Sequence, residues 1–292
     1  MRTKYEEKTY ESYFNSELSQ KTDIYFPIGQ VQEGNFGFDA AYFIRNKRLW
    51  KKFGFPFSFW RFWDYPFHGV DFREIADEME DFLQMELDHL PTMKTNLLFQ
   101  YKKPEYIYYA NGGEWHLWRQ PYFRYWIYKE QQDLLIHIHN SFSNQVLVLY
   151  AAPAIKTINE LVEKYKRKEI IDSSNFTKAV NLNNHSKNTY VEAGNYSIAC
   201  SEPEKIEKFD LLKQLKIEKE EKNIRNMRNQ EFVIDFKNKI TDIISENKIY
   251  SKSFEKLNED FQKISEYKLF HSYLVMQSFK QLTGIQWLIS LT

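Results

Sequence analysis

The run Gln145–Ala152 (QVLVLYAA) constrains the fold of this chain more than any other segment. From Val146 onward its residues are apolar at every position, so both faces of a strand built from them have to be covered. This pattern is typical of a strand inside a sheet that carries helices on both sides. Helical and extended patterns alternate around it, which predicts an α/β protein with a mixed sheet flanked by helices.

Several other segments show a clear helical or extended pattern of apolar residues. The helix predicted from residue 72 ends before Pro91, because proline cannot continue a helix cheaply. Asn111-Gly112-Gly113 is a turn signal between YIYY and EWHLW. Helical patterns cover residues 5–20, 72–90, 130–139 and 155–168, and extended patterns cover 24–44, 97–102, 121–128 and 145–152.

The composition and the pattern of the chain change near residue 202. Residues 172–202 look looser, with a short strand-like VEAGNYSIAC, and from 203 the sequence is charged and helical. We therefore predict a first domain of residues 1–202 and a helical domain of residues 203–292. The stretch from Leu269 to Leu291 is apolar at helical spacing. Such a stripe has to be buried against the first domain, a second copy or another protein. We therefore expect residues 203–292 to mediate homo-oligomerisation or partner binding.

Composition limits the class of protein. Apolar residues make up 42% of the chain, enough for a sizeable core, and no apolar run reaches the roughly 18 residues of a membrane-spanning helix. A single cysteine excludes an internal disulfide, so we expect a cytoplasmic protein without a membrane association. The formal net charge is zero, so nucleic-acid binding requires basic residues to cluster.

Polar residues interrupt apolar patterns at three places. Glu17 falls on the apolar stripe of the first helix, where a carboxylate needs a cation or a metal as its partner. Asp39 lies in FGFDAAY, with Glu33 just upstream. In LLFQYK, Gln100 and Lys102 share one face of a strand while Phe99 and Tyr101 share the other, which is how an active-site edge is built.

This order resembles the PD-(D/E)XK, or restriction-endonuclease-like, nuclease superfamily: a helix, a strand with an Asp, a strand with (Asp/Glu/Gln)-x-Lys, then a helix and a buried strand. The resemblance covers about residues 5–155. It implies that Asp39, Gln100 and Glu17 bind Mg²⁺ or Mn²⁺, with Glu33 as an extra ligand, and that Lys102 is the catalytic base or stabiliser. Gln100 departs from the usual acid and takes one charge from the metal site. The 60 residues between Asp39 and Gln100 also require an inserted aromatic loop and helix.

The chemistry suits that assignment. Hard oxygen ligands hold a magnesium ion, the metal activates water and neutralises developing charge, and a lysine stabilises the charged transition state. The resemblance implies an endonuclease that hydrolyses DNA in restriction or anti-phage defence, with RNA as another substrate. The alternative is a non-catalytic, nuclease-like subunit that binds nucleic acid or a partner.

Simpler interpretations of the same residues stay open. Asp39 fits a turn cap, Glu17 fits a side chain that reaches solvent, and Gln100 and Lys102 fit the exposed edge of a sheet. Gln131 and Gln132, at the start of the following helix, fit either a phosphate contact or an ordinary surface position.

Overall fold

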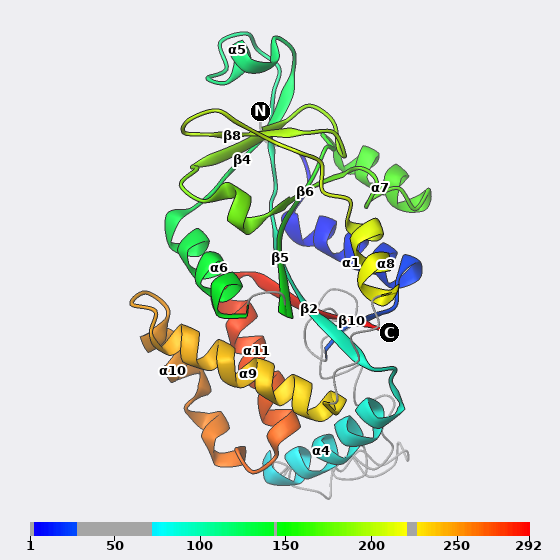
Figure 1. Ribbon diagram of the computed structural model, residues 1–292, viewed down its shortest axis with the longest axis vertical. Coiled ribbons are helices and arrows are strands. Elements are labelled where there is room, and N and C mark those ends of the chain that lie inside the picture. The colour runs from blue at the N-terminus through cyan, green and yellow to red at the C-terminus, as the bar shows by residue number, and fades with distance from the viewer. Residues whose placement is uncertain (1–2, 28–71, 143–144, 221–226) are drawn as a thin grey trace, which may run out of the picture.

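The computed structural model describes residues 3–27, 72–142, 145–220 and 227–292 of the chain (Figure 1). These residues form a mixed α/β structure with two β-sheets, which confirms the predicted class. Within the described ranges, no helix is both long enough and apolar enough to cross a membrane. Most of the predicted strand pair at residues 24–44 lies outside the described residues, as does the aromatic loop.

The first sheet is mixed. Its strands, in spatial order, are β1 (Ile24–Tyr25), β10 (Ile285–Leu291), β2 (Met93–Tyr101), β5 (Val146–Pro153) and β6 (Ser174–Lys178). Among the strands that the structure describes in this sheet, only β2 and β5 are parallel. The connection between them includes α6 (Lys129–Phe142), and a parallel pair requires such a crossover. β5 is an internal strand and almost wholly buried, so the interpretation of QVLVLYAA is confirmed.

Helices cover both faces of this sheet (Figure 1). One layer contains α1 (Glu7–Lys21), α7 (Ile158–Lys166) and α8 (Leu211–Glu220). The other contains α4 (Phe72–His89), α6, α9 (Asn229–Ser245), α10 (Ser251–Asn258) and α11 (Lys268–Thr283). The Phe14 ring of α1 lies 5.5 Å from the rings of both Phe99 and Tyr101. Because side chains alternate along a strand, Gln100 points to the opposite layer.

The second sheet is antiparallel throughout. Its strands are β3 (Glu105–Ile107), β4 (Tyr122–Trp126), β7 (Lys187–Tyr190), β8 (Ser197–Cys200) and β9 (Glu204–Ile206). Its inner face joins the main core through Phe123, Tyr125 and Tyr190. The segment predicted to be looser, residues 172–202, contributes β6, β7 and β8, and of these three strands β8 lies in the strand-like VEAGNYSIAC. After the predicted turn, the EWHLW segment forms the short helix α5 (Trp115–Trp118) and no hairpin strand. β3 pairs with β4 instead.

The C-terminal region is not helical throughout. Gly284 ends α11 in the left-handed conformation, with φ of +70°, and the next residues form β10. This strand lies between β1 and β2, and all seven of its residues are buried. The predicted helix is therefore wrong from residue 285, and the apolar residues there find their partners inside the chain. The indole N–H of Trp287, for example, donates to Asn96 Oδ1 at 2.8 Å.

Candidate functional site

Gln100 and Lys102 lie together at the carboxyl end of β2. Their side chains are only 4% and 8% exposed, on the face that α6 and α11 cover. β2 is an internal strand, flanked by β10 and β5. The interpretation of these two residues as the exposed edge of a sheet is therefore wrong.

Gln131 joins the two side chains. It lies in the first turn of α6, and its Oε1 accepts a hydrogen bond from Lys102 Nζ at 2.8 Å. Its Nε2 donates to Gln100 Oε1 at 2.6 Å and to the carbonyl of Thr283, at the end of α11, at 2.8 Å. Gln131 therefore belongs to the site. Gln132 instead has a role in the core, where it accepts from the Tyr150 hydroxyl.

The surroundings of Lys102 perturb its protonation. Burial lowers the pKa of Lys102 to about 8, although the negative charge of Glu7 opposes the shift. Burial also raises the pKa of Glu7, against the influence of the Lys102 ammonium. The hydrogen-bond partner of the ammonium is a neutral amide, so the positive charge is held in place without being cancelled at contact distance. Its Nζ also lies 5.2 Å from the centre of the Tyr128 ring.

A buried ion pair extends the site toward α11. Lys280 Nζ lies 3.2 Å from Glu11 Oε1, and both side chains are buried. Glu11 is one turn beyond Glu7 on α1, and the two carboxylates interact electrostatically. We call the following set the Lys102 cluster: Glu7, Glu11, Gln100, Lys102, Gln131 and Lys280.

Glu17 lies on another part of α1. Its carboxylate accepts hydrogen bonds from the amides of Ile170 (2.7 Å) and Ile171 (3.2 Å), after α7, and it pairs with Lys21 at 2.8 Å. The sequence correctly indicates a buried carboxylate that needs partners, and the side chain is almost fully buried. Those partners are backbone amides and a lysine, and the structure does not bring Glu17 to Gln100 and Lys102. The interpretation as a side chain that reaches solvent is wrong.

Asp39 and Glu33 lie outside the described residues. Within the described ranges, no group of three or more His, Cys, Asp or Glu side chains could hold a metal ion. The Lys102 cluster supplies hard oxygen donors of the kind that magnesium prefers, in Gln100, Glu7 and Glu11. This donor set fits a magnesium site only in part, because magnesium requires an octahedral set of ligands.

Sequence reasoning missed three members of the cluster: Glu7, Glu11 and Lys280. Glu7 and Glu11 are ordinary polar residues of an amphipathic helix by their spacing, and Lys280 follows an apolar stripe near the end of another helix. These residues are recognisable as members of the cluster only from the contact between α1 and α11 in the folded chain. Gln131 could be singled out from the sequence, because it lies in the first turn of the helix that follows β4.

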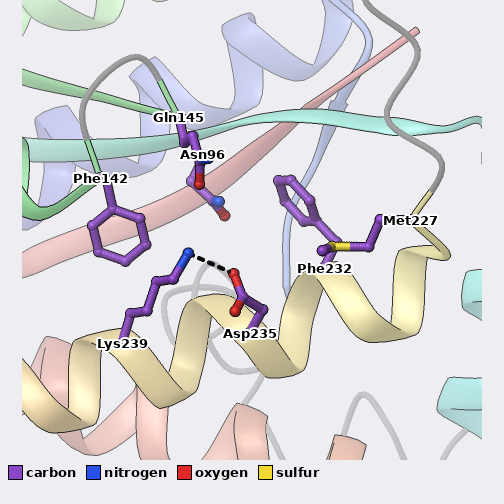
Figure 2. Close-up of a pocket in the computed structure, with 7 residues that line it drawn as sticks. All are labelled: Asn96, Phe142, Gln145, Met227, Phe232, Asp235 and Lys239. Atoms are coloured by element: carbon purple, nitrogen blue, oxygen red, sulfur yellow. Dashed lines mark ion pairs between the residues drawn. The ribbon is translucent and has the colours of Figure 1, made fainter.

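A pocket of about 170 Å³ lies elsewhere (Figure 2). Asn96 and the start of α9 contribute to it, and Asn96 is separated from Lys102 by about 20 Å of extended strand. The two charged side chains that line the pocket neutralise each other, because Lys239 Nζ lies 2.9 Å from Asp235 Oδ2. The pocket is therefore distinct from the Lys102 cluster. Its lining consists of Asn96, Phe142, Gln145, Met227, Phe232, Asp235 and Lys239.

Comparisons with protein-family models, with curated proteins and with solved structures found no match to this chain.

Proposed function

We propose that this protein is a divalent-metal-dependent endonuclease in which Lys102 and Gln100 belong to the catalytic site. One observation carries the proposal: both side chains converge in a buried cluster at the end of an internal strand. Through β3, α5 and β4, that strand leads to a helix, α6, and then to a parallel buried strand, β5. This arrangement supports the part of the resemblance to the PD-(D/E)XK superfamily that rests on Gln100, Lys102 and the following helix and strand.

Each described residue has a defined task in this proposal. The ammonium of Lys102 is only slightly exposed, and its task is to stabilise negative charge on the attacked phosphate. Gln131 orients that ammonium and also fixes the side-chain amide of Gln100, whose oxygen is a metal donor. A bound Mg²⁺ or Mn²⁺ supplies Lewis-acid activation of the phosphate and of water. Asp39 and Glu33 are the proposed acidic ligands.

The helix-derived carboxylate is reassigned. The resemblance points to a glutamate on the first helix, and the sequence favours Glu17. Glu7 is the α1 carboxylate that interacts with Lys102, whereas Glu17 is engaged with two backbone amides. We therefore assign this position to Glu7, with Glu11 beside it.

The decisive experiment is cleavage by the purified full-length chain. Plasmid DNA, single-stranded DNA and RNA are incubated with Mg²⁺ or Mn²⁺, with a chelator as the blank. Lys102→Met should lower cleavage by about 100-fold or more. Lys166→Met is the matched control, because Lys166 is exposed on α7, in the opposite helical layer, and should leave the rate within about twofold.

Two outcomes separate the proposal from its alternative. A folded wild-type protein that cleaves none of the substrates with either metal refutes the endonuclease. If that protein still binds nucleic acid or a partner, the non-catalytic nuclease-like subunit is the better description. A role in restriction or anti-phage defence rests on the resemblance alone, and phage plating on cells with wild-type or Lys102→Met protein tests it.

A further inference from the structure

Two exposed aromatic rings lie at and just beyond the end of β4, and one of them, Tyr128, lies beside Lys102. Trp126 is 43% exposed and Tyr128 is 63% exposed, while Ile127 between them is buried. The Ile127 amide donates to the Ser186 carbonyl, so the extended segment continues one residue past β4, and Tyr128 follows at the start of α6. Side chains two residues apart on an extended segment share a face and are spaced by about 7 Å. Trp126 and Tyr128 therefore present neighbouring rings on one side of the segment; we call them the ring pair.

The ring pair connects the cluster with the second sheet. The Tyr128 ring centre lies 5.2 Å from Lys102 Nζ. The Trp126 ring centre lies 5.4 Å from the Arg124 guanidinium and 5.1 Å from Lys187 Nζ. The ring pair thus extends from the ammonium assigned to the scissile phosphate along the end of β4, which leads into α6 (Figure 1).

The cations beside Trp126 are already neutralised. Arg124 pairs with Glu105 at 2.7 Å and with Glu114 at 2.9 Å, and Lys187 pairs with Glu114. Cations lie over part of both rings, and the exposed remainder of each ring is an aromatic surface without a strong net positive charge. Such a surface suits flat, stackable groups better than the phosphate backbone of a duplex, which is bound by charge.

We propose that Trp126 and Tyr128 stack on two successive bases of a single-stranded nucleic acid whose adjacent phosphate lies at Lys102. This inference rests on the proposed endonuclease function and names its substrate class as unpaired strands. In a duplex the faces of the bases are covered by their neighbours, so stacking on the ring pair requires bases that are unstacked from a complement. Stacking is tolerant of sequence, because every base has an aromatic face.

Binding without cleavage tests the inference. A fluorescent 12-nucleotide oligothymidylate is titrated with full-length protein in a chelator, and its anisotropy gives Kd. Trp126→Ala and Tyr128→Ala should each weaken binding by about 5- to 100-fold, the range typical of one lost stack. Trp126→Phe and Tyr128→Phe keep a ring and should stay within about threefold. Because both positions are exposed, all four variants should melt close to wild type.

Tyr109→Ala is the control for the loss of an exposed ring. Tyr109 is 61% exposed, beyond β3 and at the opposite end of β4 from Trp126. Its replacement should leave Kd for the oligonucleotide unchanged. A duplex of the same length should bind more weakly than the single strand, and raising the salt concentration should weaken single-strand binding only modestly.

The outcomes for the ring pair and for the endonuclease are separable. Unchanged Kd in both alanine variants, or absence of any single-strand binding, overturns the ring-pair inference. That result leaves the endonuclease intact if Lys102-dependent cleavage is observed. Conversely, single-strand binding that depends on both rings, in a protein that cuts nothing, supports the inference and refutes the endonuclease.

Discussion

The Lys280 ammonium lies 3.2 Å from the Glu11 carboxylate and ties α11 to α1 in the interior of the protein. Neither group has the free access to water that makes surface pairs weak, although Glu11 is also paired with the exposed Lys8 at 3.0 Å. The pair and the site share α11, because the Thr283 carbonyl, three residues after Lys280, accepts a hydrogen bond from Gln131. Its integrity therefore bears on both stability and the geometry of the site.

Removing one member of this pair should be strongly destabilising. Lys280→Met leaves the Glu11 charge buried and should lower the free energy of unfolding by about 3–5 kcal/mol. Adding Glu11→Gln should recover part of the loss, with a coupling of about 1–3 kcal/mol in a double-mutant cycle measured by urea unfolding. The matched control is Lys8→Met, since Lys8 also pairs with Glu11 but is exposed, and it should change stability by less than about 1 kcal/mol. Additive effects of Lys280→Met and Glu11→Gln would show that the pair is not coupled.

Glu17 should matter for stability more than for catalysis. Glu17→Ala leaves two buried amides without their acceptor and should cost about 2–4 kcal/mol in the free energy of unfolding. Under conditions where the variant is fully folded, its cleavage rate per molecule should match wild type. Glu163→Ala removes an exposed carboxylate from α7 and is the control for stability. If Glu17→Ala keeps its stability but loses cleavage, Glu17 is a ligand of the site after all.

Glu114 should make the protein sensitive to acid. Burial raises the pKa of this carboxyl, but hydrogen bonds from Lys187, Tyr122 and Arg124 outweigh it and hold the pKa at about 2, below the ordinary value of 4.5. The unfolded chain therefore binds the proton first as the pH falls. The stabilisation is complete above about pH 4.5 and is lost as the pH approaches 2.

Urea unfolding at a series of pH values checks this dependence. Wild type should exceed Glu114→Gln in stability at pH 6, and the difference should shrink steadily below pH 4.5. Glu202→Gln, at an exposed position near the second sheet, should follow wild type throughout. A gap between wild type and Glu114→Gln that stays constant down to pH 2.5 is the contrary result.

β10 should be indispensable for the folding and the stability of the protein. Trp287→Ala empties the position of a fully buried indole and should cost about 3–5 kcal/mol, whereas Ile249→Ala, at an exposed position, should change stability by less than about 0.5 kcal/mol. Ending the chain at Gly284 removes the strand between β1 and β2 and should yield an unfolded or aggregated product. Light scattering and circular dichroism decide the matter, and a soluble, folded, truncated chain contradicts it.

The elements that could be predicted from the sequence are those with a strong local period. β5 is apolar on both faces, and the alternation in β2 separates Gln100 and Lys102 from Phe99 and Tyr101, so these strands and their facing were predictable. The second sheet was harder, because β7 reads Lys-Asn-Thr-Tyr and derives its burial from neighbours rather than from composition. β10 was predicted as helix because Ile285–Leu291 continues an apolar stripe, and only the left-handed Gly284 breaks it.

The candidate site was predictable only where one strand carried it. Gln100 and Lys102 are two residues apart, so strand geometry alone places them together. Glu11 and Lys280 come from helices at distant positions in the chain, and no local pattern brings them into contact. Glu17 shows a different limit: its burial followed from the helical stripe, but backbone amides carry no sequence signature, so its partners could not be predicted.

The position of β10 sets an order on folding during synthesis. The strand fills the space between β1 and β2, yet it is made long after both, so the sheet has an open gap until residue 291 leaves the ribosome. The nascent chain therefore exposes the unpaired edge of β2, and Gln100 and Lys102 beside it lack their neighbours on α11. A ribosome-bound chain should therefore lack an organised Lys102 cluster until α11 and β10 have been made.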